Sequence, residues 1–478
     1  MKIYKSAVCE KKITNCAFFI FYLHKIFCRN CRNKYIWEVK ILLRFMQKLA
    51  IIGAGVSGLT VARLLREKYE VTVYEKESTP GGLVRCNRLE DSLFHTCGGH
   101  IFNTKNESVM EFFQSIFDLN TEFIKADRNS SVIFENGEVA EPEYHGLFKK
   151  KSPVFNPVPY PVENHVYMFK QDIQQRVIND LFSIKRKQQS RREIKFFSTF
   201  LKNRFGDTLY DLYFKPYNEK IWQKDLSKIP LSWLEGKLPM PSPDDILLAN
   251  FNHTAERQFV HSTFWYEING GSQYLADRLA EGTNIIYDTE INEIEKTVDG
   301  WEINGNKFDK VVFCGNIKDL PKILKGINTL DDYEEQIQRL PFNGTTSVFC
   351  EIDRNPYSWI YLPGTQHKAH RIICTGNFSP SNTAKNLKLT GTVEFTNYIS
   401  KEDIDKELET MPMHPRYIGH VYNKYSYPVQ DVDTREMIQE LKDLLQKFGF
   451  YFTGRFADWE YYNMDVAMGA AMKTCKNL

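Results

Sequence analysis

The stretch "KLAIIGAGVSGLTVARLLREKYEVTVYEKESTPGGL", from Lys48 to Leu83, decides the fold. Its first apolar run, "LAIIG", is typical of a buried parallel strand, and "VTVYE" reads as a second strand after a helical stretch. Between the first strand and the helix, Gly53, Gly55 and Gly58 stand in G-x-G-x-x-G register. This order of strand, glycine loop, helix and strand predicts a dinucleotide-binding unit of the doubly wound α/β, Rossmann type.

Each residue of the glycine loop has an expected role. Gly53 makes the tight turn, Gly55 lets the backbone approach a pyrophosphate, and Gly58 lets the helix pack on the strand. The pyrophosphate is expected at the N-terminus of the helix, where free N–H groups and the helix dipole favour anions. Ser57 lies in the same turn and is a further candidate contact. Glu75 follows Gly53 by 22 residues, the place of a carboxylate that binds ribose hydroxyls.

The residues after Glu75 distinguish FAD from NAD. A simple NAD-dependent dehydrogenase needs no glycine pair there, but this chain has Gly81 and Gly82. The acid followed by a glycine pair is similar to a stretch that lies against the extended FAD in flavoproteins of the amine oxidase and related classes. That resemblance implies FAD contacts at Lys76, Gly81, Gly82 and Leu83.

Composition narrows the class of protein. The chain has 478 residues, 42 % of them apolar, and a formal net charge of +2, which argues against a dedicated nucleic-acid binder. No run of 18 uncharged apolar residues occurs, so we expect no stable membrane insertion and a cytoplasmic protein. Most of the ten cysteines are scattered singly, which is typical of reduced thiols. Cys28-x-x-Cys31 lacks partners at a zinc-ligand spacing, so we predict no metal site.

The order of the segments predicts a discontinuous FAD-binding domain. We expect it to be assembled from residues 46–130, 260–325 and 430–478. Residues 131–259 read as a mainly helical insert, and residues 326–429 as a β-rich domain on the substrate side. Met46 stands two residues before the first strand, so residues 1–45 are interpreted as an N-terminal extension outside the fold.

Several motifs carry a resemblance to a known family. In order, the chain contains "GAGVSGL", "YEKESTPGGL", "GGHIFNT", "KPYNEKIW", "INGGSQYLADRLA" and "GRFADWEYYNMDVAMGA". From Met46 onward it resembles the UDP-galactopyranose mutases, within the wider flavin amine oxidoreductase group. The resemblance implies a nucleotide-sugar substrate and an FAD that is active when reduced, with NAD(P)H as a candidate reductant. In that mechanism reduced flavin N5 attacks the anomeric carbon, UDP leaves, and the sugar on the flavin reopens and recloses as the furanose.

The resemblance also implies roles for individual residues. His100 in "GGHIFNT" would lie beside the isoalloxazine, whereas Asn103 stands where the family has a second histidine. Contacts to the FAD are implied for Gly454, Arg455, Met464 and Asp465. Contacts to the sugar diphosphate are implied for Arg354, Tyr427, Tyr461 and Asn463, with Trp222 near the substrate channel.

The chain departs from the bacterial branch of that family at one cationic position. A stretch of the form Y-T-R-K-x-W there carries a diphosphate arginine, but "YNEKIW" places Glu219 at that position. Arg354, after the strand-like "SVFCEID", matches the position of an arginine in a eukaryotic branch. Arg371, Lys220 and Lys215 are further candidates, and the sequence does not choose among them.

Two other functions remain open from the sequence. The first is an FAD oxidase or dehydrogenase, similar to amine oxidases or protoporphyrinogen oxidases. The second is an FAD-binding protein that has lost its diphosphate clamp. The sequence also leaves open the sugar, the nucleotide base and the oligomeric state.

Overall fold

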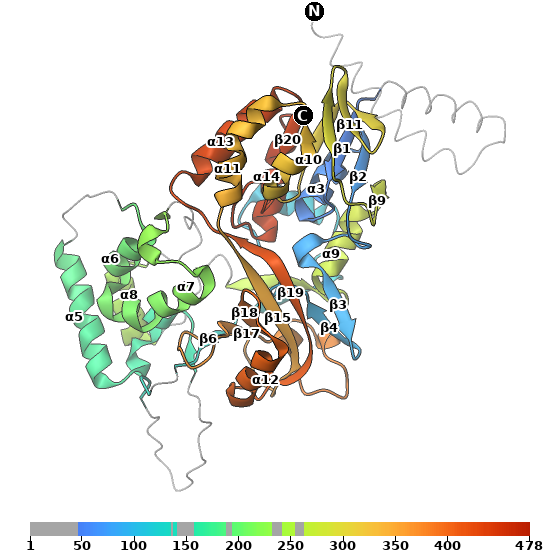
Figure 1. Cartoon of the computed structure of the whole chain (residues 1–478). Coiled ribbons are helices and arrows are strands. Elements are labelled where there is room, and N and C mark those ends of the chain that lie inside the picture. Colours follow the sequence, from blue (N-terminus) through green and yellow to red (C-terminus); the bar gives the residue numbers. More distant parts are fainter. Residues whose placement is uncertain (1–45, 135–136, 141–156, 188–193, 232–240, 254–261) are drawn as a thin grey trace, which may run out of the picture.

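The structure is a computed structural model that describes six stretches of the chain (Figure 1). These are residues 46–134, 137–140, 157–187, 194–231, 241–253 and 262–478. The N-terminal extension, and with it the Cys28-x-x-Cys31 pair, lies outside them. In the described part, no helix is both long enough and apolar enough to cross a membrane.

A five-stranded parallel sheet forms the centre of the nucleotide-binding unit, which confirms the predicted α/β fold. Its strand order is β20-β13-β1-β2-β9. The strands are β1 (Lys48–Ile52), β2 (Glu70–Tyr74), β9 (Ile285–Ile286), β13 (Lys310–Phe313) and β20 (Phe450–Phe452). Because β20 comes from the C-terminal segment, the sheet is discontinuous in sequence, as the motif order predicts.

Alternating residues of β1 face two separate apolar cores. Leu49 and Ile51 pack against the helices α3 (Val56–Leu65), α9 (Gly271–Ala280) and α14 (Met464–Cys475). On the opposite face, Ala50 and Ile52 join a core with α13 (Thr434–Gln446) and with a four-stranded sheet. That sheet has the order β12-β11-β10-β14, with β10 at Ile294–Thr297, β11 at Gly300–Ile303, β12 at Asn306–Phe308 and β14 at Leu324–Lys325.

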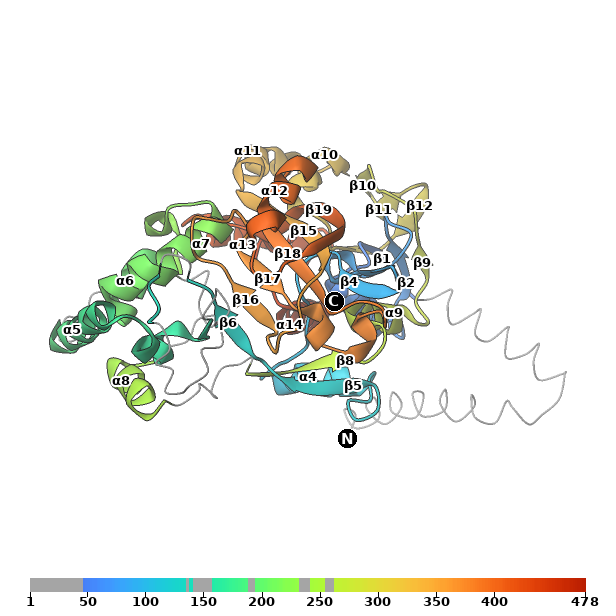
Figure 2. The same cartoon turned by 90° about the horizontal axis from the view of Figure 1, so that it is seen from below.

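A second large sheet of seven strands extends away from this unit (Figures 1 and 2). Its order is β19-β15-β18-β17-β16-β6-β7. Five strands come from the predicted β-rich segment: β15 (Phe342–Glu351), β16 (Trp359–Tyr361), β17 (Arg371–Ile373), β18 (Thr390–Thr396) and β19 (Arg416–Pro428). The other two, β6 (Ser130–Val132) and β7 (Val158–Pro159), complete its edge.

β6 and β7 lie at or within the segment 131–259 that was predicted to be mainly helical, and both belong to the seven-stranded sheet. These strands are short, and they join the sheet because β6 runs parallel to β16 and β7 pairs with β6. One face of the sheet is covered by α12 (Lys401–Thr410), which packs Ile404 and Leu408 on apolar residues of β15 to β18. The other face carries the polar side chains described below.

The predicted helical segment forms its own group at one side of the seven-stranded sheet (Figure 1). It comprises α5 (Gln171–Lys187), α6 (Phe197–Leu209), α7 (Lys215–Trp222) and α8 (Pro243–Asn252). Local sequence explains the start of α8: Ser242 and Asp245 form a capping box, and Pro243 occupies the first turn. The helices share an apolar core with Trp359 and Tyr361 of β16, which joins them to the sheet.

Candidate active site

The glycine loop at the start of α3 has a backbone that only glycine tolerates at two positions. Gly53 has φ +102°, in the left-handed region. A Cβ on Gly58 would lie 2.0 Å from the carbonyl oxygen of Gly53, so the helix packs closely on the loop. A Cβ on Gly55 would meet nothing within 4 Å, and Gly55 is the N-cap of α3 without a side-chain cap. The first N–H groups of α3 therefore face open space that suits a diphosphate.

Two other loops lie against the glycine loop at the start of α3. Gly81 donates its N–H to the carbonyl of Ala54 at 2.8 Å, and its backbone pairs with Gly55. Gly81 and Gly82 have φ +120° and +56°. From the far end of the chain, Gly454 packs so closely on Ser57 that a Cβ there would lie 3.3 Å from the Ser57 hydroxyl oxygen. Three segments predicted to contact FAD thus meet at the N-terminus of α3.

Glu75 is held at the end of β2. Its Oε2 accepts the Ala54 N–H at 2.6 Å, and its Oε1 accepts the Glu77 N–H at 3.0 Å. A carboxylate has about four acceptor sites, so both oxygens retain capacity for ribose hydroxyls. Lys76 beside it is exposed, and Leu83 is half-buried in the glycine-pair segment.

A cluster of charged and hydrogen-bonded side chains lies on the face of the seven-stranded sheet opposite α12. Arg371 on β17 pairs in register with Glu394 on β18, and the Arg371 Nε donates to Glu394 Oε2. Glu394 is fully buried. Arg371 Nη2 also donates to the Tyr427 hydroxyl at 3.1 Å, and burial raises the pKa of Tyr427, so the phenol stays protonated. We call Arg371, Glu394 and Tyr427 the clamp cluster.

Arg455, from the C-terminal segment, lies beside the clamp cluster. Its guanidinium carbon lies 5.4 Å from the Tyr427 ring centroid and 4.7 Å from that of Tyr461, a cation–π arrangement. Its Nε is buried without a hydrogen-bond partner, and no ion pair of Arg455 occurs within the described stretches. The Trp222 ring packs edge-on against both tyrosines, with centroids 5.8 Å away.

His100 meets the clamp cluster at Gly98. A Cβ on Gly98 would lie 3.7 Å from His100 Nε2 and 3.9 Å from both Arg371 Nη2 and Glu394 Oε1. The Nε2 of His100 and the Oε1 of Glu394 are both buried without a partner in the described chain. Arg455 Nε is a third buried atom of this kind. The three atoms suit a ligand that supplies complementary hydrogen-bonding groups.

The pKa values in this region reflect burial and nearby charge. Burial, and then the charge of Arg455, lowers the pKa of His100 to about 4. Burial, and then His100, lowers the pKa of His95 to about 3. Burial alone would raise the pKa of Glu394, but the charge of Arg371 and contact with His370 outweigh it and bring it to about 2. At neutral pH the histidines are neutral and Glu394 is charged.

We expect His95 to make the protein less stable in acid. Its folded pKa lies below the ordinary 6.5, so stability is fully present above pH 6.5 and is lost as the pH falls toward 3. The loss from one such group is at most about 1.4 kcal/mol per pH unit. In urea unfolding at pH 7, 6 and 5, His95→Gln should show a smaller fall in unfolding free energy than the wild type. Parallel pH dependence in both proteins would contradict this assignment.

Arg354, a predicted contact of the sugar diphosphate, lies away from the clamp cluster in the structure. It is exposed and follows β15 at the Glu351 end. Tyr427 pairs with Asn343 at the opposite end of β15, eight residues before Glu351. At about 3.3 Å per residue the two ends are roughly 26 Å apart. Arg354 therefore lies too far along β15 to share a diphosphate with Tyr427, and the structure does not bring it to the clamp cluster.

Of the other three cations that the sequence offered, the structure places Arg371 in the cluster. Lys220 Nζ donates to the carbonyls of Leu362 and Ala369 at 2.7 and 3.1 Å, and Lys215 is exposed at the start of α7. Glu219, also on α7, is half-buried and is not among the residues that contact Arg371 in the described structure.

The start of α14 brings the last predicted residues close to α3. Asn463 is the exposed N-cap of α14 and Met464 is buried in the first turn, in the same core as α3. Burial raises the pKa of Asp465, opposed by a hydrogen bond with Thr104. Sequence reasoning missed Glu394, although a lone carboxylate among the apolar residues of "GTVEFTN" is an available signal.

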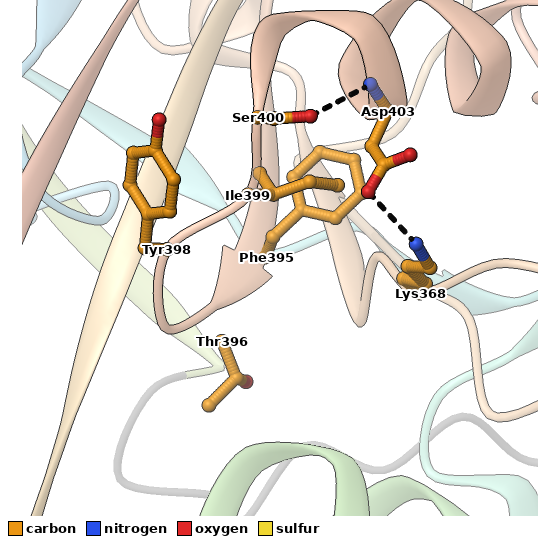
Figure 3. A pocket seen from close by; sticks show the side chains of 7 residues that line it. All are labelled: Lys368, Phe395, Thr396, Tyr398, Ile399, Ser400 and Asp403. Carbon is orange, nitrogen blue, oxygen red and sulfur yellow. Dashed lines mark hydrogen bonds and ion pairs between the residues drawn. The ribbon is translucent and has the colours of Figure 1, made fainter.

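A cavity of about 320 Å³ lies beside α12 (Figure 3). It is lined by Lys368, Phe395, Thr396, Tyr398, Ile399, Ser400 and Asp403. Ser400 already caps the helix, and Lys368 pairs with Asp403. The cavity shares no lining residue with the clamp cluster, and none of its lining residues has a buried polar atom without a partner, so it is not our candidate site.

Comparison with known proteins identifies the family. The sequence profile of "Flavin containing amine oxidoreductase" matches residues 56–416, most of the chain. The chain belongs to the flavin-containing amine oxidoreductases. Membership implies a flavin cofactor, and the open N-terminus of α3 and the unpartnered polar atoms fit such a group.

Relatives within this family include sugar mutases. The chain is 26 % identical over 440 residues to the dTDP-fucopyranose mutase of Escherichia coli, covering 90 % of this chain and 97 % of that protein. It is 39 % identical over 75 residues to the UDP-galactopyranose mutase of Mycoplasma pneumoniae, which is 15 % of this chain and 18 % of that protein.

Solved structures of the same fold include mutases and oxidases. A reduced UDP-galactopyranose mutase superposes with a TM-score of 0.76 at 18 % identity, covering 90 % of this chain and 93 % of that one. A double mutant of putrescine oxidase superposes with a TM-score of 0.58 at 12 % identity, covering 90 % and 98 %. These likenesses show the fold of this amine oxidoreductase.

Proposed function

We propose that this protein is an FAD-dependent mutase that interconverts the pyranose and furanose forms of a nucleotide sugar. The observation that carries the proposal is the clamp cluster beside Gly98 and His100, next to the glycine loops. Together with Arg455 beside it, the clamp cluster carries two positive charges, on Arg371 and Arg455, and one negative charge, on Glu394, which gives a net charge of +1. That excess suits the diphosphate of a nucleotide sugar.

The residues of the clamp cluster would hold and release the diphosphate. Arg371 presents N–H donors in a planar fork that matches phosphate oxygens, and the Tyr427 hydroxyl beside it is a further donor. Glu394 fixes the orientation of the Arg371 guanidinium from behind. Because the site is buried, these donors stabilise a departing diphosphate more strongly than they would in water.

The sugar would lie between the clamp cluster and the flavin ring. When bound, a reduced FAD supplies the nucleophilic nitrogen for the anomeric carbon, so the chain needs no side-chain nucleophile. His100 Nε2 and Glu394 Oε1 lie beside Gly98 and have no hydrogen-bond partner in the described chain. They are the groups we assign to orienting the flavin edge or the sugar hydroxyls. Trp222, Tyr427 and Tyr461 pack around the diphosphate and exclude water.

An assay of the purified, FAD-loaded protein separates this function from an oxidase. We expect conversion of UDP-galactopyranose or dTDP-fucopyranose to a furanose form, followed by chromatography, only after the flavin is reduced with dithionite. Oxygen uptake should not match turnover. A protein that leaves both sugars unchanged when reduced, or that consumes one oxygen for each amine oxidised, would contradict the proposal.

A further inference from the structure

A half-buried arginine, Arg128, lies near the clamp cluster without an acidic partner in the described chain. It stands between β5 (Phe123–Asp127) and β6, where its Nε donates to Ser130 Oγ at 3.0 Å and its Nη2 donates to the Tyr361 hydroxyl. Its guanidinium carbon lies 4.9 Å from the Trp359 ring centroid and 5.8 Å from that of Tyr160. Within the described ranges no carboxylate forms an ion pair with it.

The Arg128 guanidinium lies among aromatic rings and has no ion-pair partner in the described chain. Aromatic faces offset only part of the cost of removing a cation from water. A guanidinium has five N–H donors, and the hydrogen bonds of Arg128 to Ser130 and Tyr361 use two of them. The remaining donors therefore favour an acceptor that the protein itself does not supply.

The register of the sheet aligns Arg128 with the clamp cluster. Tyr361 on β16 pairs with Arg371 on β17, and Arg371 pairs with Glu394 on β18. Residues paired across neighbouring strands point to the same face, about 4.8 Å apart. Along this row the order is Glu394 beside Gly98 and His100, then Arg371, then Tyr361 with Arg128.

A nucleotide sugar has the same linear order of parts: sugar, diphosphate, nucleoside. With the sugar beside Glu394 and His100 and the diphosphate on Arg371, the nucleoside extends one strand further, to Tyr361 and Arg128. The Tyr217 ring packs edge-on against Tyr361, with centroids 5.3 Å apart, and closes this end with aromatic surface.

We propose that Arg128 is a specificity-determining residue that donates a hydrogen bond to a ring carbonyl of the pyrimidine base. Tyr361 positions its guanidinium through the hydroxyl contact. Uracil and thymine share such carbonyls, so this hydrogen bond does not distinguish a UDP-sugar from a dTDP-sugar. The inference rests on the proposed function. It assigns Arg128 to binding, and not to breaking the bond between sugar and diphosphate.

The test compares nucleotide and pyrophosphate binding by isothermal titration of the FAD-loaded protein. We expect Arg128→Met to raise the Kd for UDP and dTDP at least tenfold and to leave the Kd for inorganic pyrophosphate within twofold. In turnover, KM for the nucleotide sugar should rise while kcat stays within about threefold. The exposed Arg354→Met is the matched control and should equal the wild type throughout.

Tyr361→Phe is the second variant, because it keeps the ring and removes only the hydroxyl. It should raise the Kd for UDP at least threefold, and it decides the question if Arg128→Met does not fold. An unchanged Kd for UDP in the folded variants overturns this inference alone. An equal loss of pyrophosphate binding also overturns it, because Arg128 would then contact the diphosphate. A wild-type protein that binds no pyrimidine nucleotide overturns the proposed function as well.

Discussion

Arg371→Met is expected to lower kcat/KM for the nucleotide sugar by on the order of 10²- to 10³-fold, the effect of removing a donor that stabilises departing charge. Arg371 is the only guanidinium that contacts both Glu394 and Tyr427 in the described structure. The same change leaves Glu394 buried without its main partner, which costs about 3–5 kcal/mol of stability. Turnover and UDP affinity should therefore be measured well below the melting temperature of the variant.

Two variants separate charge from geometry. Arg371→Lys keeps the positive charge but loses the planar fork that contacts Glu394 and Tyr427, so we expect an intermediate loss. Arg354→Met removes a cation at the far end of β15 and should retain full activity. Normal activity of Arg371→Met, or a large loss in Arg354→Met, would show that the diphosphate binds elsewhere.

Alanine at Gly58 and alanine at Gly55 are expected to fail in different ways. The new Cβ of Gly58→Ala would lie 2.0 Å from the Gly53 carbonyl oxygen, so α3 must move and both stability and flavin are lost. Gly55→Ala adds a methyl group that meets no protein atom within 4 Å. That variant should fold normally, yet lose most of its flavin because the methyl group occupies the diphosphate position.

Flavin absorbance per protein and the melting temperature of the flavin-free protein distinguish these two outcomes. For Gly58→Ala, both the flavin content and the melting temperature should be lower than in the wild type. For Gly55→Ala, only the flavin content should be lower. A yellow Gly55→Ala protein with wild-type flavin content would mean that no diphosphate approaches the backbone at this turn.

The nucleotide-binding unit was predictable because its signal is local. The β1–α3–β2 unit occupies one continuous stretch, and within it Gly53 and Gly58 satisfy backbone requirements that nearby residues impose. The return of the C-terminal segment to the same sheet followed from a second strand and glycine loop near Gly454. Short strands were harder to predict from the sequence. β7 has only two residues, too few to show a strand pattern, and it is a strand because it pairs with β6.

The sequence could not choose Arg371 among the candidate cations because its contacts depend on pairing between strands. Arg354 was proposed from a resemblance to a eukaryotic branch of the family, by its offset after a strand, which is a local criterion. Arg371 meets Glu394 through register across β17 and β18, and it meets Tyr427 because β18 and β19 both pair with β15. The 22 residues between Arg371 and Glu394 contain nothing that marks the two as a pair. Only the sheet order reveals it.

The most direct test of the central claim is a difference spectrum of the bound flavin during titration with UDP. Because the clamp cluster meets the Gly98 and His100 loop, we predict a saturable change in flavin absorbance in the wild type and a strongly weakened one in Arg371→Met. Trp222 fluorescence should change with the same midpoint, since its ring packs on Tyr427 and Tyr461. No spectral change with UDP or dTDP at millimolar concentration would contradict a nucleotide-sugar site beside the flavin.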